Sequence, residues 1–262
     1  MHKIFIITMK KTLFLCFLAS VLLAACGGRQ QSDSEGALAD IYKNAPGDST
    51  RYGLACDGST DSILVFLPYG TTHLDTFDII NAFQNHQIYG RPLIGDELAV
   101  IVNPEDSAEA LKVINLETLR GTWCYMVTPT LRSVDKMPKR MQQRMMERIP
   151  DSLLKQWMAP REYSLRLKSD HGVTARGGVY RQTSDDMTPV EYPAFTRYTD
   201  WRIFNGRLIL KADTIAGFTK EGEVPTVDTV DIRLLRQDTL VLQFPDHEQS
   251  YYRKQEVSEL TK

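Results

Sequence analysis

The sequence feature that most constrains the fold is a period-two alternation of apolar and polar side chains in the C-terminal half of the chain. In residues 163–168, Tyr, Leu and Leu alternate with Ser, Arg and Lys, and similar alternation recurs at 230–234 and 240–244. Successive side chains of a strand point to opposite faces, so this pattern is typical of a sheet with one buried and one solvated side. We therefore expect antiparallel β-structure here.

A turn signal supports this expectation. Asn205-Gly206 lies between the stretches 202–204 and 207–210, and two-residue loops of this composition favour β-hairpins. Successive strands joined by short turns predict an antiparallel barrel whose strands follow sequential order.

The N-terminal half also predicts strands, at 52–56, at 98–102 and at 63–67, an apolar run that Pro68 ends. Weaker strand candidates are 77–82, 87–89 and 108–114. The fold class is therefore mainly β. A small β-barrel or curled sheet at 49–118 is expected before a larger antiparallel barrel at 119–258.

One segment, Pro138 to Met158, has helical character interrupted at Pro150. Met141, Met145 and Ile149 share one face by i, i+4 spacing, and three arginines (140, 144 and 148) share another. We favour a helical insertion whose Met side chains cover one end of the barrel. The alternative is a basic amphipathic helix that rests on a membrane.

The first residues have the layout of a secretory signal peptide. Lys10 and Lys11 precede an apolar run at 13–25, which is too short to span a bilayer. The run ends in Leu23-Ala24-Ala25-Cys26, and this ending resembles a bacterial lipobox. The alternative is an ordinary signal peptide that meets a cysteine.

The lipobox resemblance implies cleavage before Cys26 and attachment of lipid to that cysteine. Gly27, in place of Asp, implies the outer membrane by the same resemblance; whether the protein faces the periplasm or the cell surface stays open. Residues 26–48 are polar and predict a lipidated tether. The partner expected from this segment is therefore a membrane.

Composition limits the other partners. Removal of residues 1–25 takes away three lysines and no acidic residue, so the formal net charge changes from −2 to −5. An acidic mature chain argues against a nucleic-acid partner. Its length is sufficient for one large or two small domains with a real core.

Two cysteines remain after the leader and Cys26 are set aside. Cys56 and Cys124 would lie in a compartment where disulfides form. They could form one disulfide, or they could be two buried free thiols in neighbouring strands.

The junction of the two halves carries a further resemblance. Gly121-Thr122-Trp123 resembles the motif at the first strand of the lipocalins, in which the glycine permits close backbone approach and the tryptophan closes the barrel floor. With Trp201-Arg202-Ile203, the strand at 238–242 and Tyr251-Tyr252-Arg253-Lys254, the chain resembles the lipocalin-like lipoproteins of Bacteroidetes. This resemblance implies a fold and a location more than an activity.

No catalytic or metal-binding pattern is convincing. Gly47-Asp48-Ser49 lacks the buried strand that precedes an esterase nucleophile. His73, Asp75 and Asp78 match no zinc or calcium spacing, and His171 and His247 fall in expected turns. We predict neither catalytic nor metal-ligating residues, no cofactor and no enzymatic activity.

Two functions remain in competition. The first is a binding module whose barrel takes a small apolar ligand, with Trp123, Tyr125, Trp201 and Phe204 available to line the inner face. The second is a structural or accessory lipoprotein that acts through contacts with an envelope protein, for example around Trp157 and the helical insertion.

Overall fold

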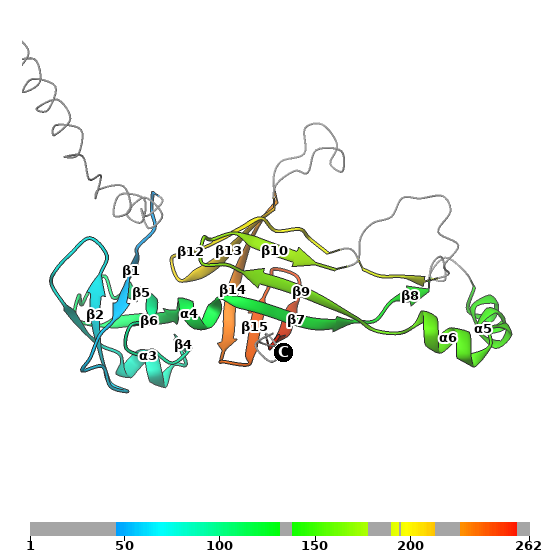
Figure 1. Ribbon diagram of the computed structural model, residues 1–262, viewed down its shortest axis with the longest axis horizontal. Helices are drawn as coiled ribbons and strands as arrows, with labels where there is room; N and C mark the ends of the chain where they lie inside the picture. Colours follow the sequence, from blue (N-terminus) through cyan, green and yellow to red (C-terminus); the bar gives the residue numbers. More distant parts are fainter. Residues whose placement is uncertain (1–45, 132–137, 178–189, 194, 213–225, 256–262) are drawn as a thin grey trace, which may run out of the picture. The chain divides into compact units, whose positions relative to one another are not determined.

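A computed structural model describes residues 46–131, 138–177, 190–193, 195–212 and 226–255, without the side chains of 131, 142, 145 and 146. Within these ranges the chain forms a six-stranded sheet, an eight-stranded sheet and a pair of short strands (Figure 1). The prediction of a mainly β fold is confirmed. The leader, Cys26 and most of the predicted tether lie outside the described residues.

The six-stranded sheet has the strand order β3-β2-β1-β5-β6-β4, and only β4 runs parallel to its neighbour. The sheet curls back on itself, because Asp78 at the end of β3 forms a bridge with Glu109 just before β6. Its interior holds a cluster of buried side chains that includes Leu64, Phe66 and Phe77. The strands are β1 (Thr50–Ala55), β2 (Ile63–Pro68), β3 (Asp75–Asp78), β4 (Ile88–Tyr89), β5 (Glu97–Val102) and β6 (Ala110–Asn115).

One strand prediction in this sheet is wrong in part. Residues 77–82 do not continue as a strand, because β3 ends at Asp78 and helix α3 (Ile80–Gln84) follows. The Asp78 carboxylate accepts a hydrogen bond from the amide of Ile80 at 2.8 Å. Such a bond, two residues along the chain, turns the backbone away from the strand.

The eight-stranded sheet has the order β10-β9-β7-β16-β15-β14-β13-β12, and its neighbours pair antiparallel. Two main-chain hydrogen bonds join the outer strands, from Val173 to Thr199 (2.7 Å) and from Trp201 to His171 (2.8 Å), so the barrel is nearly closed. The strands are β7 (Gly121–Val127), β9 (Arg161–Leu167), β10 (Val173–Arg176), β12 (Asp200–Phe204), β13 (Arg207–Ala212), β14 (Thr226–Leu235), β15 (Thr239–Gln243) and β16 (Glu248–Arg253).

The alternation predicted from the sequence is the alternation of the barrel wall. Leu165 and Leu167 are fully buried in the barrel core, whereas Arg166 between them is exposed. The predicted hairpin is also confirmed, since Asn205 and Gly206 both have positive φ (48° and 69°) between β12 and β13. Positive φ at both positions is the geometry of a type I′ turn.

Trp123 closes one end of the barrel, as the lipocalin resemblance implied. Its side chain is fully buried, and the indole N–H donates to the carbonyl of Leu119 in helix α4 (Leu116–Leu119) at 2.7 Å. The Arg253 guanidinium lies 4.2 Å from the centre of the Trp123 ring. It donates to the carbonyls of Thr118 and Gln237, and to that of Arg120 at 2.8 Å. One side chain therefore ties the last strand to the first.

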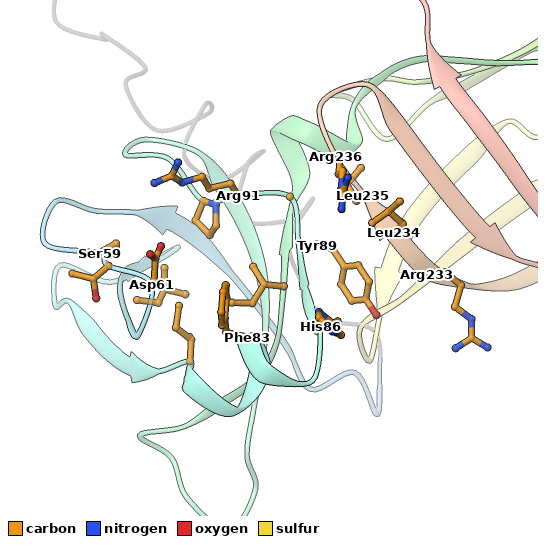
Figure 2. A pocket seen from close by; sticks show the side chains of 16 residues that line it. Ser59, Asp61, Phe83, His86, Tyr89, Arg91, Arg233, Leu234, Leu235 and Arg236 are labelled. Carbon is orange, nitrogen blue, oxygen red and sulfur yellow. The ribbon is translucent and has the colours of Figure 1, made fainter.

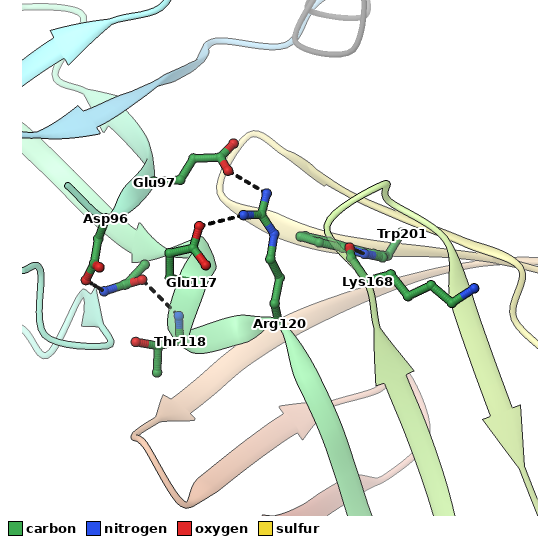
Figure 3. A network of polar contacts seen from close by, with 8 residues as sticks. Asp96, Glu97, Glu117, Thr118, Arg120, Lys168 and Trp201 are labelled. Carbon is green, nitrogen blue, oxygen red and sulfur yellow. Dashed lines mark hydrogen bonds and ion pairs between the residues drawn. The ribbon is translucent and has the colours of Figure 1, made fainter. Parts of the chain in front are cut away.

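A polar network lies where the chain leaves the six-stranded sheet for the barrel (Figure 3). Arg120 pairs with Glu97 of β5 at 2.5 Å and with Glu117 of α4 at 2.8 Å. Buried Asn115 donates to Asp96 at 2.6 Å and accepts from the amide of Thr118 at 2.9 Å, which caps α4. The strand β5 is thus connected to the first residues of the barrel by charge-assisted hydrogen bonds.

The two sheets also share other contacts. The Tyr52 hydroxyl donates to the carbonyl of Ile203 at 2.8 Å, and the amide of Asn205 donates to the Asp48 carboxylate at 2.9 Å. Ala99 and Ile114 of the six-stranded sheet, called the small sheet below, belong to the same buried cluster as the barrel residues. The predicted domain boundary at 118/119 stays a prediction.

The helical insertion is confirmed as α5 (Lys139–Arg148) and α6 (Asp151–Trp157), which flank Pro150. Met141 does not cover the barrel, because its side chain is 58% exposed, and α6 has no buried residue. A separate pair of short strands, β8 (Thr130–Leu131) and β11 (Val190–Glu191), is also present. No helix among the described residues is both long and apolar enough to cross a bilayer.

The position of the Arg253 guanidinium beside Trp123 predicts a specific need for glycine at position 121. Gly121 has φ of 126°, and a methyl group there would overlap the Arg253 guanidinium. We expect Gly121→Ala to lower the free energy of unfolding by about 2–4 kcal/mol, from backbone strain together with displacement of Arg253. Urea denaturation measures the change.

The matched control is Gly95→Ala. Gly95 also has positive φ (87°), but an added methyl group there would meet nothing within 4 Å. This variant should show the backbone cost alone, about 1–2 kcal/mol. Equal losses in the two variants would contradict the role of Arg253.

Candidate binding site at the barrel mouth

The end of the barrel opposite Trp123 is hollow. The cavity has a volume of about 720 Å³, within the range of small-molecule sites. Its walls come from the end of β7, the start of β9, the start of β14, residues 193 and 195–198, the turn between β15 and β16, and β16 itself. The lining residues are Tyr125, Met126, Val127, Thr128, Tyr163, Pro193, Phe195, Thr196, Tyr198, Thr226, Asp228, Phe244, Pro245, Asp246, His247, Gln249 and Tyr251.

Four aromatic rings form the inner wall of this mouth. The Tyr125 ring packs edge-on against Tyr163 and Tyr251, with centroids 5.7 and 5.2 Å apart. Phe195 packs against Tyr163 at 5.8 Å and against Tyr125 at 6.3 Å. Edge-to-face contacts of this kind hold rings in fixed orientations, so the wall is a rigid apolar surface.

Polar groups also line the mouth. The Tyr198 hydroxyl donates to the Asp228 carboxylate, and the His247 ring stacks on Phe244 with centroids 4.8 Å apart. His247 Nδ1 lies 2.7 Å from the Asp246 carboxylate. Among the described lining residues, Asp228 and Asp246 are the acidic side chains, and no lysine or arginine lines the mouth.

The surroundings alter the proton affinities of these tyrosines. Burial, and secondly Tyr163, raise the pKa of Tyr125 to about 12. Burial also raises the pKa of Tyr251 and, together with the hydrogen bond to Asp228, that of Tyr198. These hydroxyls are therefore neutral hydrogen-bonding groups at physiological pH.

The four predicted lining residues divide between three places. Tyr125 lies at the mouth, whereas Trp123 and Trp201 are fully buried deeper in the core, where the Trp201 indole donates to the carbonyl of Lys168 at 2.9 Å. The prediction for Phe204 is wrong. Trp201 and Ile203 point inward, so Phe204 shares the outer face of β12 with Arg202, whose guanidinium lies 5.8 Å from the ring centre.

The possible disulfide does not form. Cys56 and Cys124 are free thiols, and only Cys124 lies within a strand. Cys56 follows β1 and is half-buried, whereas Cys124 is buried in β7 and is paired in register with Ser164 and Tyr252. Cys26, the predicted lipid attachment site, lies outside the described residues.

The discounted polar motifs have structural partners. Asp48 accepts hydrogen bonds from Thr50 and Asn205, and Asp75 pairs with Arg51 at 3.3 Å. Among the residues that the structure describes, no three His, Cys, Asp or Glu side chains are grouped as metal ligands.

A second cavity, of about 670 Å³, lies where the six-stranded sheet meets β14 and its following turn. Figure 2 shows Tyr89 inside it, between Phe83 and His86 on one side and the segment 233–236 on the other. The amide of Gly90 donates to the carbonyl of Leu235 at 3.1 Å, which joins the two walls. We call this cavity the seam pocket.

Most of the mouth residues were not predicted from the sequence. The alternation at 163–167 placed Tyr163 on an apolar face, whereas residues 248–253 do not alternate apolar with polar side chains and gave no such signal for Tyr251. Phe195 and Tyr198 belong to an irregular segment without periodicity. Only their position beside the barrel end makes them part of the site.

The comparisons with known proteins agree with this geometry. Residues 151–255, less than half of the chain, match a family model described as lipocalin-like. The match covers seven of the eight barrel strands, namely β9, β10 and β12 to β16. It does not include β7, the strand that carries Trp123. The search of curated proteins and the search of solved structures found no match. Lipocalin-like domains typically bind small hydrophobic ligands and are typically not enzymes.

The raised pKa of Tyr125 predicts a fall in stability at high pH. An unfolded tyrosine ionises near pH 10, whereas folded Tyr125 ionises near 12. The folded state therefore holds more protons between these values, and the free energy of unfolding falls as pH rises from 10 to 12. Urea denaturation at pH 9, 10 and 11 measures the slope.

Tyr125→Phe should reduce this slope, because the titrating hydroxyl is gone and the ring is kept. Tyr192→Phe is the control, since Tyr192 lies outside the mouth and donates to the carbonyl of Ala159. An unchanged slope in Tyr125→Phe would contradict the burial of Tyr125 in the mouth.

Proposed function

We propose that the mature chain is an outer-membrane-anchored lipoprotein whose barrel mouth binds a small apolar ligand. The observation that carries the proposal is the aromatic hollow of about 720 Å³ above a floor that Trp123 closes. The cavity is closed at the Trp123 end and open at the opposite end. An apolar ligand can enter through the open end and be shielded from water by the aromatic wall.

The mouth favours ligands without negative charge. An anion in this cavity would approach the carboxylates of Asp228 and Asp246, and no described lining residue offers it a lysine or arginine. A neutral apolar molecule with one or two hydrogen-bonding groups could instead contact the aromatic wall and the tyrosine hydroxyls.

Binding of a neutral apolar fluorophore tests the proposal. N-phenyl-1-naphthylamine should gain fluorescence on saturable binding to residues 26–262. Phe195→Ala should weaken the binding about fivefold, the ratio for roughly 1 kcal/mol of lost ring contact. Fluorescence titration measures both values.

Phe204→Ala is the matched control, because it removes a ring of equal size from the outer face of the same barrel. It should leave the affinity unchanged. Absence of saturable binding, or equal weakening in both variants, would remove the proposed function.

The membrane address rests on the sequence before residue 46. The apolar run, the preceding lysines and Leu23-Ala24-Ala25-Cys26 support a lipid on Cys26, and several acyl chains together give lasting attachment. The polar residues 27–45 would then separate the folded sheets from the membrane surface.

Metabolic labelling tests this address. An alkyne-bearing fatty acid should label the wild-type protein, and Cys26→Ser should lose the label and leave the membrane fraction. Cys16→Ser is the control, since Cys16 would be removed with the leader. A labelled Cys26→Ser variant would contradict the proposed anchor.

A second role, contact with an envelope protein, is favoured by a separate observation. Phe83 of helix α3 and Leu93 and Ile94 of the loop before β5 are each more than half exposed. Phe83 lines the seam pocket, whereas Leu93 and Ile94 precede β5. Photo-crosslinking from position 94 in cells should capture one defined protein, and a smear without a discrete product would count against this role.

A further inference from the structure

The seam pocket differs from the mouth in its charge. Three arginines line it, at positions 91, 233 and 236, and all three are exposed. None of them makes an ion pair with another described residue, and Asp61 is the acidic side chain of the described lining. Figure 2 shows the three guanidinium groups at separate points around the edge, with Tyr89 between them.

The positive charge continues behind the pocket wall. Lys112 Nζ lies 5.7 Å from the centre of the Tyr89 ring and donates to the carbonyl of Gly206 at 3.2 Å. The nearest carboxylate on β14, Asp231, is already paired with Arg207 at 2.7 Å. Burial lowers the pKa of Lys112 most strongly. Asp231 opposes this effect and raises the pKa, whereas the charges of Arg207 and Arg233 lower it further. The region therefore has an excess of cations.

The interior of the pocket is apolar. Tyr89, Leu64 and Leu235 are buried against it, and Phe83 is 57% exposed at its edge. An exposed phenylalanine beside a cavity leaves apolar surface in water, which an alkyl chain would cover. The volume of about 670 Å³ is large enough for such a chain.

We propose that the seam pocket binds an amphipathic anion with one carboxylate or phosphate head and one alkyl chain. The head lies at the arginine edge, where guanidinium groups donate paired hydrogen bonds to oxyanions. The chain lies against Tyr89, Phe83 and Leu234. The inference is independent of the proposed ligand of the mouth, because it rests on a different cavity with the opposite charge.

Four probes separate the contributions of head and chain. They are laurate, dodecyl phosphate, dodecanol and inorganic phosphate, each titrated calorimetrically below its micelle concentration into residues 26–262 carrying Cys26→Ser. Laurate and dodecyl phosphate should bind at least tenfold more tightly than dodecanol, which lacks the charged head. Inorganic phosphate, which lacks the chain, should bind more weakly than laurate and more weakly than dodecyl phosphate. The ratio of laurate to dodecyl phosphate identifies the preferred head. Equal affinities for laurate and dodecanol would overturn the proposal.

Two double variants locate the site. Arg233→Gln with Arg236→Gln should weaken laurate binding at least tenfold, because both charges at one edge are lost. Arg140→Gln with Arg144→Gln changes the net charge equally on the exposed helix α5 and should leave the affinity unchanged. Equal weakening in both would indicate a general charge effect and would overturn the proposal.

The variant Phe195→Ala separates this proposal from that of the mouth. Laurate affinity should be retained in Phe195→Ala while N-phenyl-1-naphthylamine binding weakens. Laurate binding that is lost in Phe195→Ala and kept in the Arg233/Arg236 double variant would place the anion in the mouth and overturn the seam proposal alone. Thermal denaturation of each variant verifies that it is folded. Arg233→Lys keeps the positive charge and should therefore bind laurate more tightly than Arg233→Gln does.

Discussion

The contact between Trp123 and Arg253 is the constraint on which the rest of the barrel depends. Trp123 stands at the start of β7 and Arg253 at the end of β16, so their stacking joins the first and last strands of the barrel domain. The same guanidinium bonds the carbonyls of α4 and of the turn before β15. With this end filled, the interior can be open only at the other end, where Tyr125, Tyr163 and Tyr251 leave a cavity.

The joint between the sheets follows from the same end of the barrel. Helix α4 receives the Trp123 indole N–H on one side, and its neighbour Arg120 reaches Glu97 of the small sheet on the other. The seam pocket lies between Tyr89 of the six-stranded sheet and the end of β14. Two cavities formed by described residues therefore have similar volume and opposite charge, one acidic and aromatic, the other edged by arginines.

Much of the fold could be predicted from the sequence, because alternation reports directly which face of a strand is buried. This reasoning located β9, β14 and β15, the Asn205-Gly206 turn and the helices around Pro150. It failed where a side chain–backbone bond redirects the chain, as at Asp78, and where the phase of the alternation was not followed, as at Phe204. The site was harder to predict, because Phe195 and Tyr198 acquire their roles only from the tertiary contacts of an irregular segment.

The central claim, that the open end of the barrel receives an apolar ligand, is tested most directly by nuclear magnetic resonance of labelled tyrosine rings. The protein would be titrated with N-phenyl-1-naphthylamine and each ring assigned by substitution. We expect saturable shifts for Tyr125, Tyr163 and Tyr251, and none for Tyr69 and Tyr252, which lie exposed outside the mouth. Saturable shifts confined to Tyr69 or Tyr252, or no saturable shift in any ring, would contradict the central claim.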